Sequence, residues 1–258
     1  MPIMARVIVI TSGKGGVGKT TCCANIGRAL AARGRKTLLV EGDIGLNNLD
    51  AVLRVEDGIL YDIGEYAAGK ATLRQCLMPV EENLWLLPAT AASSMLTAAF
   101  FSETVNKLKV EFDFVIIDSP AGLEEGFHRA VSCAQEAVIV TTPHVTCIRD
   151  GYKTARVLEG YGIKKIGLIV NRVRGEWVVK KEIVSPEKAA EVMNVPLIGT
   201  VPEDDDLNIF GLVGMKDGAD VTAAVKMIAA YLDGAGKRIY DCTARWRGIK
   251  NKLRRWLG

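Results

Sequence analysis

The sequence contains few of the residues that build structural metal sites. Among its 258 residues there are two histidines, and its six cysteines include no Cys-x-x-Cys pair. Zinc or iron–sulfur binding by a single chain is therefore not expected, because such sites need closely spaced thiolate or imidazole ligands. Scattered cysteines of this kind are typical of a protein that keeps free thiols in a reducing cytoplasm.

Long apolar segments are also missing. No run reaches 18 uninterrupted apolar residues, and the first apolar run is only as long as one strand before a glycine-rich loop begins. A transmembrane helix and a signal peptide are therefore not expected. Hydrophobic residues still make up 49% of the chain, which is enough to bury the core of one large domain or two small ones.

Acidic residues are nearly absent from the last part of the sequence. Residues 237–258 contain eight Lys or Arg and one acid, Asp241, which is a local charge of +7. Because the whole chain carries +3, residues 1–236 carry −4. A mildly acidic body with a strongly basic tail indicates a polyanionic partner for the tail alone.

Short apolar, β-branched runs alternate with helical patterns along the chain. We expect strands over residues 7–10, 37–40, 85–87, 114–117, 137–140, 166–170 and 197–201, and helices over residues 19–32, 97–110, 145–161, 186–193 and 221–232. This alternation predicts an α/β fold, a doubly wound and mostly parallel sheet of about seven to eight strands with helices on both faces. We expect one domain over residues 1–236, followed by an appendage over residues 237–258.

A glycine-rich segment after the first predicted strand has the phosphate-loop spacing G-x-x-x-x-G-K-[ST]. Its glycines allow the backbone to curl until successive N–H groups point at phosphate oxygens. Lys19 can then reach the β- and γ-phosphates, and the Thr20 hydroxyl can bind Mg²⁺. The residues predicted to contact nucleotide here are Gly13, Lys14, Gly15, Gly16, Val17, Gly18, Lys19, Thr20 and Thr21.

Two carboxylates stand where predicted strands end, which is where ligands bind in open α/β sheets. Asp118 ends a wholly apolar strand, an arrangement that holds Mg²⁺ through its water shell opposite Thr20. Asp43 follows the second strand beside Gly42, and its carboxylate could orient the water that attacks a γ-phosphate. By spacing alone, a turn or helix-capping role for Asp43 is equally good.

Lys14 is a second cation in a loop that ordinarily needs one, and it gives the loop a family resemblance. The segment resembles the K-G-G-x-G-K-[ST] loop of the deviant Walker-A ATPases of the MinD/ParA family. In that family the first lysine acts across a dimer interface. The resemblance therefore implies a homodimer formed with ATP, with ATP and Mg²⁺ as cofactors and with Lys14 and Lys19 as catalytic residues.

Two further segments are similar to the MinD branch of this family. Residues 41–50 resemble its D-x-D-x-G-x-x-N motif, which favours Asp43 as the catalytic residue that positions water, although Glu41 stands where the motif has Asp. The run Asp118-Ser119-Pro120-Ala121-Gly122 resembles the same branch.

The resemblance also implies roles for residues farther along the chain. The N-R-V and P-E-D segments stand where family members contact the nucleotide base, so Asn171, Arg172, Pro202 and Glu203 are expected to bind nucleotide. Loop asparagines and prolines are otherwise common turn residues. The pair Arg149-Asp150 matches an R-D pair near the dimer and partner surface of the family, and a solvated helix end is the alternative.

The tail has the pattern of an amphipathic helix. At 100° per residue its apolar residues fall within an arc of about 100°, with cations on the opposite side. The apolar residues are Trp246, Ile249, Leu253, Trp256 and Leu257, and the opposing cations include Arg247, Lys250 and Arg254. Tryptophans on an apolar stripe with basic flanks suit the surface of an anionic membrane. The alternatives are a helix docked on its own domain and, less favoured, a nucleic-acid-binding tail.

Together the phosphate loop, the Asp43 segment, the Asp118 run and the basic tail resemble the MinD branch of the family. The resemblance implies an ATP hydrolase that cycles between the cytoplasm and the inner face of the cell membrane and controls division-site placement. Family partners are the division inhibitor MinC and either the activator MinE or another topological regulator, and no specific nucleic acid is expected. The alternatives are a ParA-type DNA-partitioning ATPase, a flagellar-number regulator of the same family, and an iron–sulfur carrier that would use Cys133 and Cys147 between subunits.

Overall fold

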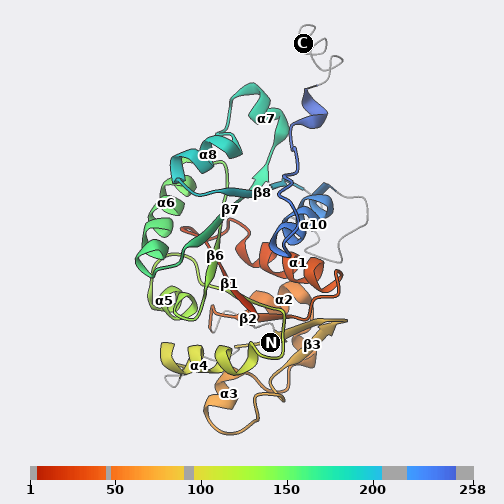
Figure 1. Ribbon diagram of the computed structural model, residues 1–258, viewed down its shortest axis with the longest axis vertical. Helices are drawn as coiled ribbons and strands as arrows, with labels where there is room; N and C mark the ends of the chain where they lie inside the picture. Colours follow the sequence, from red (N-terminus) through yellow and green to blue (C-terminus); the bar gives the residue numbers. More distant parts are fainter. Residues whose placement is uncertain (1–4, 45–47, 90–95, 205–219, 248–258) are drawn as a thin grey trace.

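Eight strands form one sheet at the centre of the molecule (Figure 1), in the order β3-β4-β2-β5-β1-β6-β7-β8. The computed structural model describes residues 5–44, 48–89, 96–204 and 220–247. The strands are β1 (Arg6–Thr11), β2 (Thr37–Glu41), β3 (Met78–Glu81), β4 (Leu84–Leu87), β5 (Phe114–Asp118), β6 (Glu136–Thr141), β7 (Lys165–Val173) and β8 (Leu197–Pro202). Every neighbouring pair is parallel except β3 and β4. The predicted mostly parallel sheet is therefore confirmed.

Helices connect the strands and cover both faces of the sheet. They are α1 (Lys19–Ala31), α2 (Asn48–Leu53), α3 (Ile63–Ala67), α4 (Ala98–Leu108), α5 (Glu125–Val131), α6 (Val145–Gly160), α7 (Gly175–Lys180), α8 (Pro186–Met193) and α10 (Asp220–Leu232), with 3₁₀ turns η1 (Glu56–Gly58) and η2 (Ala244–Trp246). The five predicted helices are confirmed to within two residues at each end. Of the described helices, none has the length and apolar character needed to pass through a lipid bilayer.

The central strand divides its apolar side chains between two cores. Val7 and Val9 of β1 join the core under α4, α5, α6 and α8, whereas Ile8 and Ile10 join the core under α1, α2 and α10. Alternate residues of a strand point to opposite faces, so a strand covered on both sides must be apolar throughout. This explains why the strand patterns in the sequence are nearly continuous.

After α10 the described chain crosses back over β8, and its last turn lies beside α7. The Thr200 hydroxyl of β8 donates a hydrogen bond to the Tyr240 carbonyl, and Arg245 forms an ion pair of 2.9 Å with Asp220 at the start of α10. These contacts hold η2 on the body of the molecule. The rest of the predicted amphipathic helix, with Ile249, Lys250, Leu253, Arg254, Trp256 and Leu257, lies outside the described residues and stays a prediction.

Candidate nucleotide and phosphate site

The phosphate loop connects the end of the central strand to α1. β1 lies between β5 and β6, so the loop emerges at the middle of the sheet edge. The N-cap residue of α1 is Gly18, which has no side chain to cap the first turn, and that turn contains no acidic residue. The first N–H groups of a helix carry partial positive charge and need partners. The start of α1 therefore suits a phosphate group.

Gly18 ends the loop in a conformation that favours glycine. Its φ is 89°, and a Cβ at this position would overlap the side-chain amide of Asn171. Asn171 in turn donates from Nδ2 to the Val17 carbonyl at 2.9 Å. This hydrogen bond stabilises the conformation of the phosphate loop. Asn171 is also one of the residues predicted to contact the nucleotide.

The other end of the loop rests directly on α6. A Cβ on Gly13 would overlap the backbone of Asp150, so the two backbones touch without an intervening side chain. Lys14 is exposed at the top of the loop, where its carbonyl accepts a hydrogen bond of 3.0 Å from the Ser12 hydroxyl. Arg149 is also exposed, and its Nε lies 3.8 Å from the Asp150 carboxylate. The predicted dimer and partner residues thus lie next to the phosphate loop.

Asp118 brings together the two residues that follow the loop glycines. Its carboxylate lies 2.9 Å from Lys19 Nζ and accepts a hydrogen bond of 2.6 Å from the Thr20 hydroxyl. Asp118 and Lys19 are both buried. A hydroxyl and a carboxylate at this separation are the oxygen ligands that Mg²⁺ prefers, and the adjacent ammonium suits a phosphate. The residues present therefore fit a Mg²⁺–nucleotide complex, as the sequence predicted for Lys19, Thr20 and Asp118.

Glu41 anchors the segment that contains Asp43. Its buried carboxylate accepts hydrogen bonds from three backbone N–H groups, those of Asp43 at 3.0 Å, Asn48 at 3.1 Å and Leu49 at 2.9 Å. The register of β2 and β5 also places Glu41 opposite Asp118. Burial, with a further contribution from the charge of Asp118, raises the pKa of Glu41 to about 7. The residue that departs from the family motif is thus the support of the predicted catalytic segment.

Asp43 is half-buried beside the phosphate site. Its carboxylate accepts a long hydrogen bond of 3.4 Å from the Asn48 amide. Burial raises the pKa of Asp43, while the positive charges of Lys19 and Arg129 act in the opposite direction. Asp43 therefore interacts electrostatically with both the phosphate-binding lysine and a cation of α5. Arg129 was not predicted, because α5 has a weak helical pattern in the sequence.

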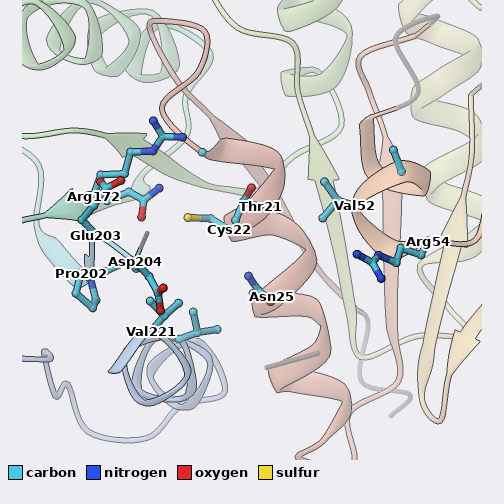
Figure 2. A pocket seen from close by; sticks show the side chains of 15 residues that line it. Thr21, Cys22, Asn25, Val52, Arg54, Arg172, Pro202, Glu203, Asp204 and Val221 are labelled. Atoms are coloured by element: carbon cyan, nitrogen blue, oxygen red, sulfur yellow. The ribbon is translucent and has the colours of Figure 1, made fainter. Parts of the chain in front are cut away.

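A cavity of about 340 Å³ opens beside the first turns of α1 (Figure 2). The ends of β7 and β8, α2 and α10 form its other walls. The cavity is lined by Gly18, Thr21, Cys22, Asn25, Ala51, Val52, Arg54, Asn171, Arg172, Val201, Pro202, Glu203, Asp204, Val221 and Val225. The structure therefore brings together the four residues predicted to contact the nucleotide base. The volume of the cavity lies within the usual range of small-molecule sites.

Asn25 is a lining residue that the sequence did not reveal. It lies on α1, is buried, and its side-chain oxygen has no hydrogen-bond partner within the part of the chain that the structure describes. Figure 2 shows it on the α1 wall, across the cavity from Pro202 and Glu203. A buried acceptor without a partner is costly unless a bound group supplies a donor. The cavity thus contains a polar contact available to a base or a ribose.

The chain matches a family profile described as the CobQ/CobB/MinD/ParA nucleotide binding domain, over residues 8–215. It is 41% identical to the septum site-determining protein MinD of Synechocystis sp. over 263 aligned positions, which cover 98% of this chain and 99% of that protein.

Two solved structures are similar over most of the chain. MinD in the MinC:MinD cell division protein complex of Aquifex aeolicus has a TM-score of 0.83 and 38% identity, with 90% of this chain and 97% of that chain covered. MinD of Pyrococcus horikoshii OT3, solved as a complex with Mg-ADP, has a TM-score of 0.80 and 35% identity, with 90% and 97% covered. In the second structure a nucleotide and a metal ion are bound by a protein of the same fold.

Proposed function

The chain belongs to the MinD branch of the CobQ/CobB/MinD/ParA nucleotide-binding family, and from that premise we propose that it is an ATP-hydrolysing switch that controls division-site placement from the membrane surface. The observation that carries the proposal is the joint placement of Lys19, Thr20 and Asp118 at the open start of α1. That arrangement binds phosphate and a divalent cation and has little use in a purely structural domain.

ATP is bound with its phosphates on the loop and its base in the cavity beside α1. Lys19 would contact the phosphates, and the oxygens of Thr20 and Asp118 would hold Mg²⁺. The bound cation supplies charge neutralisation for phosphoryl transfer. Arg172, Pro202 and Glu203 contact the base or ribose from the side of β7 and β8, and Asn25 contacts it from α1.

Asp43 orients the water for hydrolysis. Its carboxylate lies on the same side of the sheet edge as Lys19, and the hydrogen bonds to Glu41 fix the backbone on both sides of it. Phosphoryl transfer depends mainly on positioning and charge, so a carboxylate held in place is sufficient for this step.

Two subunits form a dimer around bound ATP. Lys14 is exposed at the top of the loop, where it can extend to the phosphates of a second subunit. The dimer carries two basic tails, and the second tail binds an anionic membrane at a raised effective concentration once the first is attached. The protein thus moves from the cytoplasm to the inner face of the cell membrane when it binds ATP, and returns after hydrolysis. The membrane-bound dimer recruits a MinC-like division inhibitor, and a MinE-like or other regulator sets the rate of ATP hydrolysis.

Sedimentation with vesicles tests this proposal. The full chain is mixed with vesicles that contain phosphatidylglycerol, in the presence of ATP, ADP or no nucleotide. We expect most of the protein in the pellet with ATP and little with ADP. Equal binding to vesicles with ATP and with ADP would contradict the proposal that ATP controls membrane binding.

The same protein is applied to nonspecific DNA at low and moderate salt. ATP-dependent, salt-sensitive retention on DNA together with failure to bind vesicles would identify a partitioning ATPase instead.

A further inference from the structure

Two exposed tryptophans lie at the same end of the molecule, on segments far apart in the sequence. Trp177 of α7 is 38% exposed and Trp246 of η2 is 39% exposed. In Figure 1, α7 and the final described turn of the chain lie together at one end, away from α3 and α4. Exposed tryptophan rings are unusual enough on a soluble surface to need a reason when two of them are neighbours.

A backbone contact fixes this arrangement. A Cβ on Gly175, the first residue of α7, would overlap the Cys242 carbonyl, and it would lie 2.8 Å from the indole Cδ1 of Trp246. η2 is therefore packed against the start of α7, two residues before Trp177. The hydrogen bond from Thr200 to Tyr240 and the ion pair of Arg245 with Asp220 attach the same segment to β8 and α10. The two tryptophans are thus displayed by a rigid corner of the fold.

Several cations lie on the same two segments as these rings. The Arg174 guanidinium lies 5.0 Å from the centre of the Trp177 ring, and Lys180, Lys181 and Arg247 are exposed. Residues 174–182 and 237–247 together contain seven Lys or Arg against three acids. We call the set Arg174, Trp177, Lys180, Lys181, Trp246 and Arg247 the α7 corner. It combines amphipathic aromatic rings with a positive surface, which is the composition that binds the headgroup region of an anionic bilayer.

We propose that the α7 corner is a second lipid-contacting surface, which docks on anionic headgroups beside the tail. The inference rests on the proposed membrane binding and adds to it a contact made by the folded body. Arg247, the last described residue before the predicted tail, belongs to this corner, so a membrane that receives the tail would be close to Trp177 and Lys181. Two separate contacts hold the body in one orientation, whereas a tail alone would leave it free to turn.

Quenching of tryptophan emission by brominated lipid tests the proposal. Trp85 is replaced by Phe, and Trp246 and Trp256 are replaced by Tyr, which keeps an amphipathic ring at both positions, so that Trp177 is the single tryptophan of the full chain. Vesicles contain phosphatidylglycerol and phosphatidylcholine brominated near the glycerol end of its acyl chains. With ATP we expect the Trp177 emission to be quenched, and with ADP it should be unchanged.

A matched chain keeps Trp85 as its single tryptophan. Trp85 is partly buried on β4 and packs edge to face with Phe112, so its emission should be unaffected by the vesicles. A Trp177 chain that sediments with ATP but is not quenched would overturn the inference and leave the proposed function intact. Failure of the natural chain to sediment at all would count against the proposed function. Shielding of Trp177 from acrylamide by ATP without vesicles would show that a second copy covers the corner, and the inference would be wrong.

Charge removal gives an independent measurement. Lys180→Ala and Lys181→Ala should each weaken vesicle binding about fivefold per subunit, and more in a dimer, because each cation near an anionic leaflet contributes comparably. Lys107→Ala on α4 is the control, since Lys107 is exposed at a distance from the corner and pairs with Glu103. Equal effects of all three substitutions would contradict a specific role of the α7 corner.

Discussion

Replacing Glu41 by Gln separates the support that this residue gives to the Asp43 segment from the cost of its buried charge. In the natural chain one carboxylate oxygen accepts from Asp43 N–H and the other accepts from Asn48 and Leu49 N–H. A glutamine has one acceptor oxygen, so its amide group must face at least one of these donors. Losing a buried hydrogen bond in this way costs about 1–3 kcal/mol.

Ionisation of Glu41 as the pH rises lowers the stability of the natural chain, whereas its hydrogen bonds raise that stability. The pKa of Glu41 is about 7 in the folded protein, compared with 4.5 for an ordinary glutamate, because of burial and the nearby Asp118. A carboxyl group with a raised pKa stabilises the fold fully below its unfolded pKa, and that stabilisation is lost as pH rises through the folded pKa. Between pH 5 and pH 8 this group should therefore lower the free energy of unfolding by about 2–3 kcal/mol. A glutamine does not titrate and avoids that loss.

Urea unfolding at pH 5 and pH 8, with EDTA and without nucleotide, measures the two effects. At pH 5, Glu41→Gln should be about 1–2 kcal/mol less stable than the natural chain. At pH 8 it should be equally stable or more stable. If the two proteins differ in free energy of unfolding by the same amount at pH 5 and pH 8, Glu41 does not have the raised pKa of a buried carboxyl group.

Three other substitutions and one matched control, Gly16→Ala, test the site. Asp43→Ala should lower ATP hydrolysis about a hundredfold while leaving an ATP dimer in light scattering; a variant that stays monomeric with ATP would remove Asp43 from the hydrolytic step. Lys14→Ala should still bind a fluorescent ATP analogue but stay monomeric, and dimerisation of this variant would contradict the role of Lys14 across the interface. Gly18→Ala should lose about 2–3 kcal/mol in urea unfolding, from left-handed strain and displacement of Asn171. Gly16→Ala, with φ 75° and open space around the added Cβ, should lose about 1 kcal/mol, and equal losses would show that the Asn171 contact is unimportant.

The sheet and the phosphate loop could be predicted because each depends on residues that are close in the sequence. The strand patterns are nearly continuous since both faces are buried, and the fixed spacing from Gly13 to Thr20 encodes the loop. The capping box of α3, in which Asp62 and Glu65 exchange hydrogen bonds, also depends on residues that are close in the sequence. The short antiparallel strand β3 gave no comparable signal, because its residues alternate between exposed and half-buried and it includes a proline.

Contacts between distant segments could not be predicted. Asn171 supports Val17 because β7 and β1 are separated by a single strand in the sheet, which the sequence does not state. Two of the three N–H groups that donate to Glu41 belong to the start of α2, so these hydrogen bonds depend on where α2 packs in the fold. Trp177 lies in a short segment with a weak helical pattern, and its proximity to Trp246 depends on the packing of η2 beside Gly175.

The contact between Gly13 and the backbone of Asp150 has a mechanical consequence. A side chain between two elements can change rotamer and absorb a small displacement, but two backbones in contact cannot. On the far side of α6, a Cβ on Gly151 would lie 2.8 Å from the terminal carbon of Met193, so the helix has little space to yield there either. A displacement of α6 near Arg149 would therefore be transmitted to the phosphate loop, because no side chain lies between the two backbones to absorb it.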